Sequence, residues 1–169
     1  RVLPVKAVGV QGDNRTYRNV VALEGKADYA KLEEVSTLIT NSFNAVNRVV
    51  LLLAPQKISS IKLNEAYLTH ERIQKLRQAD ELAMKTTDAA RLQNEIWQFP
   101  VVLLPVDFNG RGEGIVLRPV SSREAMTAKF YLPAQDVLDE MVRKIMEVKG
   151  VGAVMLDVTH KPPATIEWE

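Results

Sequence analysis

The chain has 169 residues, a formal net charge of +1 and no cysteine, and 46% of its residues are hydrophobic. This composition is typical of a globular protein and excludes a disulfide framework, a thiolate nucleophile, Cys-ligated metal sites and a broadly basic nucleic-acid binder. No apolar run approaches the roughly 20 residues that span a bilayer, and the first residues lack a signal-peptide pattern. We therefore expect a cytoplasmic fragment of a longer chain, with neither membrane nor nucleic acid as a partner.

The first half of the sequence predicts two strands, a helix and a further strand. An apolar strand follows Leu3, and a polar loop separates it from a second strand over 20–23. Apolar residues at helical spacing then predict an amphipathic helix over 28–43 that Asp28 can cap. The run over 46–53 is short, apolar and partly β-branched, which favours a central strand.

The second half repeats this order. Strands are predicted over 100–106 and 115–118, with a glycine-rich loop between them. A helix over 133–148 has a proline in its first turn and a glycine just past its end, which is the usual asymmetry of helix termini. The apolar run over 151–158 predicts another central strand. Each half therefore places one amphipathic helix against a small antiparallel-type sheet.

The intervening residues are rich in helix-forming residues and predict one or two helices. We predict an α+β fold of two tandem two-layer modules, residues 1–54 and 96–169, joined by a helical connector over 55–95.

Two segments carry candidate binding groups. The turn that contains Asp13 also presents Arg15. The guanidinium can bind a phosphate in a bidentate manner, and the carboxylate can accept hydrogen bonds from ribose or base donors. A hairpin turn with solvated charges explains the same residues. The tail over 161–169 presents Lys161 and Glu167, and its two prolines fix an extended path. A hydrophobic clasp and a ligand site remain equal alternatives for this tail.

Other reactive side chains form no catalytic pattern. His70 and His160 lack any metal-ligand spacing, and no Ser–His–Asp arrangement can be argued. We therefore predict neither a catalytic residue nor a metal site. Trp97 and Phe99 are expected in the core, and Gln98 between them points the other way.

Several motifs together resemble one family. The tail KPPATIEWE, the opening LPVKAVGVQGDNRTYRNVVAL and the segment VLRPVSSREAMTAKF resemble the C-terminal dimerisation domain of GMP synthase. That family is a glutamine-hydrolysing ligase that aminates XMP to GMP. LRQAD and WQFPVVLLPVDF are similar to the elongated form of eukaryote-type enzymes, in which the module is doubled. The resemblance implies a KH-like or prodomain-like fold.

The resemblance also implies a substrate site. The residues that match the family's XMP contacts are Asp13, Arg15, Gln98, Lys161, Ile166 and Glu167. ATP and Mg would act in the parent enzyme's ATP pyrophosphatase domain, an expected partner in the same chain, and the fragment alone would hold no cofactor and be inactive. The first half keeps the QGD-x-R loop but not the tail, and the second half keeps the tail but not the loop. This split suggests one composite XMP surface formed by both halves, and either a homodimer or an internal pseudo-dimer.

Two other functions remain possible at this point. A purely structural dimerisation module would make no ligand contact. A KH-like RNA-binding module needs a GxxG loop between helices, and the letters GVQG at 9–12 instead end a predicted strand.

Overall fold

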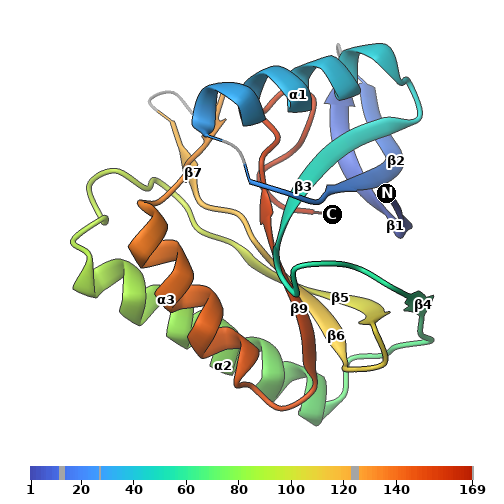
Figure 1. Cartoon of the computed structure of the whole chain (residues 1–169). Coiled ribbons are helices and arrows are strands. Elements are labelled where there is room, and N and C mark those ends of the chain that lie inside the picture. The colour runs from blue at the N-terminus through green and yellow to red at the C-terminus, as the bar shows by residue number, and fades with distance from the viewer. Residues whose placement is uncertain (12–13, 27, 123–125, 169) are drawn as a thin grey trace.

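A computed structural model of the chain describes residues 1–11, 14–26, 28–122 and 126–168 (Figure 1). The elements in chain order are β1 (Val2–Gln11), β2 (Asn14–Leu23), α1 (Tyr29–Ser42), β3 (Val46–Ala54), β4 (Ile61–Leu63), α2 (His70–Ala89), β5 (Val101–Phe108), β6 (Glu113–Leu117), β7 (Val120–Ser121), β8 (Lys129–Phe130), α3 (Gln135–Met146) and β9 (Val151–Asp157).

The helices and strands with strong periodicity lie where the sequence predicts them. The predicted helix over 28–43 is α1, and Asp28 caps it by accepting the Lys31 N–H at 2.9 Å. The predicted helix over 133–148 is α3. The two apolar runs are β3 and β9, which are neighbours in the middle of the main sheet. Their central placement is therefore confirmed.

The strands of both halves belong to one sheet, with the order β1-β2-β3-β9-β6-β5-β4. In each half a hairpin is antiparallel and its second strand runs parallel to the strand after the helix: β2 beside β3, and β6 beside β9. β3 and β9 then pair antiparallel. The expectation of a separate antiparallel-type sheet in each half is therefore wrong. One mixed sheet forms because β3 and β9 would otherwise each leave an unpaired, apolar edge.

Alternate side chains of the central strands enter two different cores. Val49 and Leu51 of β3 pack with all three helices, whereas Val50 and Leu52 point to the opposite face. Burial on both faces explains why these strands are almost continuously apolar.

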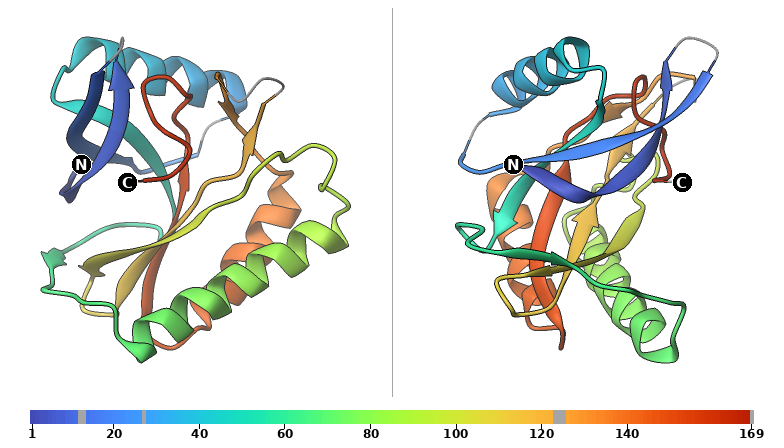
Figure 2. Two further views of the ribbon diagram at one scale, coloured as in Figure 1. Left: turned by 180° about the vertical axis from the view of Figure 1, so that it is seen from behind. Right: turned by 90° about the vertical axis from the view of Figure 1, so that its right-hand side faces the viewer.

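The sheet curls so strongly that its own outer strands cover the face without helices. The second core joins β1 and β2 side chains, such as Leu3 and Val20, to Val106 and Phe108 of β5. β1 lies in contact with β4 and β5, at the other end of the strand order (Figure 2). This curl brings the first hairpin and the end of the chain to one side of the molecule.

The connector contains β4 and α2 rather than helices alone. Thr69 caps α2, and Lys75 of this helix donates to Glu113 of β6 at 2.7 Å, so the connector is anchored to the sheet. The predicted boundaries at 54/55 and 95/96 fall between elements, and the division into two modules remains a prediction. Gly9 lies within β1, which does not provide the loop between helices that a GxxG motif requires.

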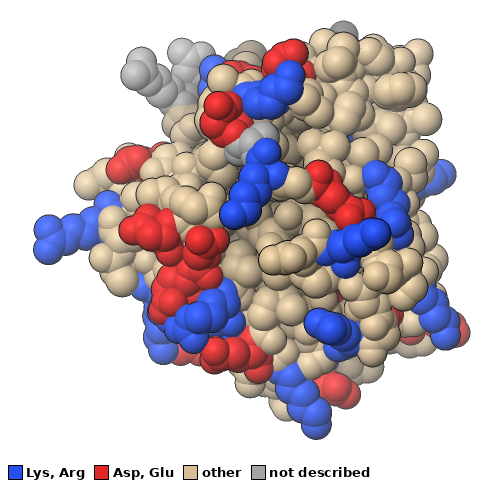
Figure 3. Space-filling model, in the orientation of Figure 1, with Lys and Arg blue, Asp and Glu red and all other residues tan. Residues whose placement is uncertain are grey.

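Charges of both signs are interspersed over the face drawn in Figure 3, with acidic groups gathered over α3. Within the described ranges, no helix is both long and apolar enough to cross a membrane.

Candidate functional site

The C-terminal tail docks along the free edge of β1. The N–H of Val8 donates to the carbonyl of Trp168 at 3.0 Å, and the N–H of Val10 donates to that of Pro163 at 2.7 Å. Alternate tail side chains are buried, namely Ala164, Ile166 and Trp168. Residues 162–163 form a turn and residues 166–167 a bend, so the tail is a looped segment rather than the extended path that its prolines predicted, and it covers an edge of the sheet that would otherwise be unpaired.

Gly9 permits this close approach. It forms an isolated β-bridge with Ala164, and a Cβ at this position would lie 2.5 Å from the carbonyl oxygen of Pro163 and 2.7 Å from Asn47 Nδ2. Any side chain at Gly9 would therefore push the tail away from β1.

Three fully buried charged residues lie beneath the tail. Asp157, at the end of β9, accepts from Arg48 Nη1 at 2.7 Å and lies 2.9 Å from Arg118 Nη1. All three side chains are 0% exposed. The indole of Trp168 also donates to Asp157 at 3.0 Å and stacks near the Arg48 guanidinium, 4.8 Å from ring centroid to Cζ. The tail is thus held by hydrogen bonds and charge as well as by apolar contact.

The charge states of this cluster follow from its surroundings. Burial lowers the pKa of Arg118 to about 10, and Asp157 opposes that effect, so Arg118 stays cationic at neutral pH. Burial alone would raise the pKa of Asp157. The two guanidiniums outweigh it and hold that pKa below its ordinary value. The cluster therefore contains two cations and one anion.

The start of the tail is fixed by a second set of contacts. The N–H of Phe130 donates to His160 Nδ1 at 3.3 Å, which leaves Nε2 to donate to Glu33 of α1 at 2.8 Å. This hydrogen bond is the main reason that the pKa of Glu33 is lowered. The backbone of the next residue, Lys161, pairs with Ala128 in both directions.

The predicted XMP contacts surround this docked tail. Arg15 is exposed on β2, directly opposite Val10, which bonds to Pro163 of the tail. Lys161 is half-buried and Glu167 is exposed, whereas Ile166 is buried. Asp13 lies outside the described residues.

Gln98 belongs to the same region through its backbone. It is exposed, and its carbonyl accepts from the N–H of Val120 at 2.9 Å. Val120 in turn packs with Ala128 and Ile166 in a small apolar cluster. The tail therefore lies between Arg15 on one side and the Gln98 segment on the other.

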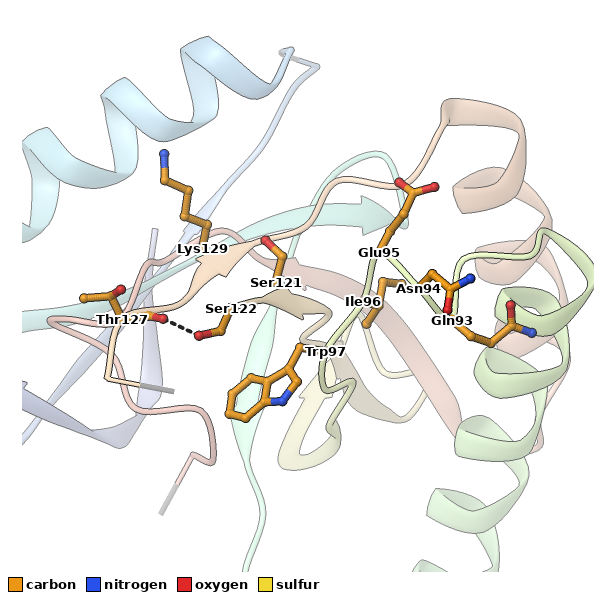
Figure 4. Close-up of a pocket in the computed structure, with 9 residues that line it drawn as sticks. All are labelled: Gln93, Asn94, Glu95, Ile96, Trp97, Ser121, Ser122, Thr127 and Lys129. Atoms are coloured by element: carbon orange, nitrogen blue, oxygen red, sulfur yellow. Dashed lines mark hydrogen bonds between the residues drawn. The ribbon is translucent and has the colours of Figure 1, made fainter. Parts of the chain in front are cut away.

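A hollow of about 850 Å³ opens beside Trp97 (Figure 4). Two segments line it: the chain after α2 supplies Gln93, Asn94, Glu95, Ile96 and Trp97, and the β7–β8 region supplies Ser121, Ser122, Thr127 and Lys129. The expectation that Trp97 is a core residue is wrong. Its side chain is 44% exposed because the neighbouring Ile96 occupies the buried position, whereas Phe99 packs against the main core.

The described part of the chain contains no group of three or more His, Cys, Asp or Glu side chains that could hold a metal ion. The surface instead offers cations, carboxylates and amides for hydrogen bonding. Such a set can bind and orient a polar anionic ligand.

Sequence reasoning missed the buried cluster, although a signal was present. Arg48 is a lone charged residue within a run of seven buried positions in β3, and Asp157 is the charged end of the equally buried β9. A charge at such a position is almost never buried without a partner, so the pattern predicts an ion pair between these strands.

The sequence comparisons agree with the resemblance. Residues 85–168 match the family described as GMP synthase C terminal domain. A probable glutamine-hydrolysing GMP synthase of Leptospira interrogans is 40% identical over 100% of this chain and 28% of its own length. The corresponding protein of Caenorhabditis elegans is 37% identical over 99% of the chain and 26% of its own length, and the GMP synthase of Corynebacterium diphtheriae is 38% identical over 92% and 33%.

The chain belongs to the GMP synthase C-terminal domain family.

The family and the enzyme class predicted from the sequence are thereby confirmed, since these relatives are glutamine-hydrolysing GMP synthases. The chain spans about a quarter to a third of the length of the relatives just given. The activity, substrates and partners of a whole GMP synthase therefore enter as proposals.

Proposed function

We propose that this chain is the substrate-completing and assembly domain of a GMP synthase, which aminates XMP to GMP with ATP and glutamine-derived ammonia. In this proposal ATP and Mg act in an ATP pyrophosphatase domain of the same enzyme, and the chain contributes XMP contacts rather than the bond-making steps. The fragment alone is inactive.

The docked tail is the observation that carries this proposal. It lies beside the hairpin that bears Arg15 and keeps Glu167 at the surface. Arg15 and Lys161 have the charge to bind the monophosphate, and Glu167 can accept from ribose hydroxyls. Asp13 is assigned the same accepting role from its motif. Because the side chain of Ile166 is buried, its contact has to come from its main chain.

The strand order supports an internal pseudo-dimer. Both halves contain an antiparallel hairpin, a helix and a strand parallel to the hairpin, and they meet through the antiparallel pair β3–β9. Two copies of a module related by a two-fold axis would pair in this way. In this proposal Arg15 comes from one half and Lys161 from the other, so a single composite XMP surface results.

The test uses a full-length GMP synthase that carries this chain. Lys161→Met and Arg15→Met each remove one cation, and each is expected to raise the KM for XMP roughly tenfold to a hundredfold, the value of a charge-assisted hydrogen bond. Arg143→Met is the matched control, because Arg143 is exposed on α3 and pairs locally with Glu140 and Glu147.

The kinetic pattern separates ligand contact from a purely structural role. A raised KM for XMP with an unchanged KM for ATP supports the proposal. Unchanged kinetics in both variants, with altered assembly of the enzyme, would instead identify a structural dimerisation module.

A further inference from the structure

Two buried arginines hold the peptide groups of the tail. Arg118 donates through Nε to the carbonyl of Ile166 at 2.8 Å and through Nη2 to that of Thr165 at 2.7 Å. Arg48 Nη2 donates to the carbonyl of Glu167 at 3.0 Å and to the Thr165 hydroxyl at 3.0 Å. The carbonyls of three consecutive tail residues therefore all accept hydrogen bonds from a guanidinium.

Only arginine can supply this set of contacts. A guanidinium presents five donors in one rigid plane, so Arg118 reaches the carbonyls of Thr159, Thr165 and Ile166 while it also pairs with Asp157. A lysine at this position would keep the charge but lose the planar fork. The fork fixes the orientation of consecutive peptide groups, which a point charge cannot do.

The excess positive charge of the cluster couples it to the tail. Arg48 and Arg118 share the single carboxylate of Asp157, and all three side chains are fully buried. The remaining donors need acceptors, because an unpaired buried donor on a charged group is costly. Arg48 Nη2 also donates to the Val8 carbonyl of β1, and Arg48 Nε has no partner within the described structure. The other donors end on tail oxygens, so they are paired only when the tail lies in this one register.

We propose that Arg48 and Arg118, oriented by Asp157, are positioning residues of the XMP site that set the register of the tail. This inference rests on the proposed function. The guanidiniums touch no substrate themselves. They act through the main chain of residues 165–167, which includes two of the residues assigned to XMP contact.

A second buried ion pair distinguishes positioning from general stability. Lys75 of α2 donates to Glu113 of β6 at 2.7 Å, with both side chains about one-tenth exposed, and neither residue contacts the tail in the described structure. Loss of this pair should weaken the fold without moving the tail. Lys75→Met is therefore the matched control.

The experiment compares Arg118→Lys with Lys75→Met in a full-length GMP synthase that carries this chain. Arg118→Lys is expected to raise the KM for XMP about tenfold or more, because small displacements of binding groups have effects of this size. The KM for ATP and the glutaminase rate should change less than about twofold, since the tail touches neither reaction. Lys75→Met should lower the melting temperature and leave the KM for XMP unchanged.

Thr165→Val keeps the test valid if Arg118→Lys does not fold. It removes only the hydroxyl that accepts from Arg48 and donates to the Val8 carbonyl at 3.0 Å, at a half-buried position. The expected rise in the KM for XMP is roughly threefold to tenfold, which corresponds to the loss of one or two hydrogen bonds.

The outcomes separate this inference from the proposed function. The positioning role is overturned if Lys161→Met raises the KM for XMP but Arg118→Lys leaves it unchanged. If Arg118→Lys does not fold, an unchanged KM for XMP in Thr165→Val overturns the role in the same way. An equal rise in Lys75→Met overturns it as well, because the effect is then one of stability. If Lys161→Met and Arg15→Met also leave the KM unchanged, the proposed function itself fails.

Discussion

Replacing Asp157 with asparagine tests the buried cluster most directly. Asparagine keeps the shape of the side chain but removes its charge, and it turns an NH₂ group toward guanidinium donors. Asp157 accepts from Arg48 at 2.7 Å, from Trp168 at 3.0 Å and from the N–H of Thr159 at 3.0 Å. Removal of one partner from a fully buried ion pair costs about 3–5 kcal/mol, because the remaining charge stays buried without compensation.

This loss is large relative to the stability of a typical domain, which is about 5–15 kcal/mol. For a chain of this length it corresponds to a fall of roughly 6–20 °C in Tm. Urea unfolding followed by circular dichroism measures the free energy of unfolding, and an unchanged m-value shows that the two-state comparison holds.

Glu140→Gln is the control for Asp157→Asn. Glu140 also bonds to cations, Arg143 and Lys144, which lower its pKa to about 2, but its side chain is 43% exposed. Exposed ion pairs contribute little to stability, so this variant should unfold like the parent. A loss below about 1 kcal/mol in Asp157→Asn would refute the reasoning, because no buried charge would then depend on this carboxylate.

Three further predictions concern the same fold. The pKa of Asp157 in the folded chain lies below its unfolded value of about 3.9. Its contribution to stability is therefore complete above that pH and is lost as the pH falls through the lower, folded pKa. Acid titration followed by circular dichroism measures this loss of stability. Gly9→Ala should force the Pro163 carbonyl away from β1 and shift the indole N–H resonance of Trp168. Thr69→Ala should destabilise the chain by about 1 kcal/mol in urea, because it removes the side-chain cap of α2.

Each of these predictions has a contradicting result. An acid midpoint that is identical in Asp157→Asn would show that this carboxyl does not set it. An unshifted Trp168 resonance in Gly9→Ala would show that the tail tolerates a Cβ there. Thr69→Ser preserves the capping hydroxyl, so a loss as large as that of Thr69→Ala would exclude capping as the cause.

Local pattern predicted the elements well but not how they join. The helices over 28–43 and 133–148 and the apolar strands 46–53 and 151–158 were all predictable, because their periodicity depends on near neighbours. The pairing of Val50 with Asp157 was not, since no local signal specifies which distant edge a strand will meet. That missing pairing is why two sheets were expected.

The contact residues of the candidate site were predictable from the sequence, but the buried side chains that hold them in place were not. The tail and Arg15 stand out through turn and proline chemistry, and family resemblance named the remaining contacts. The roles of Arg48 and Arg118 depend on tail carbonyls more than 45 positions away in the chain, which spacing cannot reveal. Trp97 was misplaced because alternation alone did not show that Ile96 would take the buried position.

The antiparallel pair β3–β9 has a consequence for how the chain folds. Arg48 and its partner Asp157 are 109 positions apart, so the centre of the sheet closes only after these further residues are available. Contacts of such separation slow folding. At synthesis rates of about 5–20 residues per second, β3 leaves the ribosome about 5–20 s before β9. During that interval an apolar strand lacks its neighbour, and we expect nascent chains to need protection from aggregation until β9 arrives.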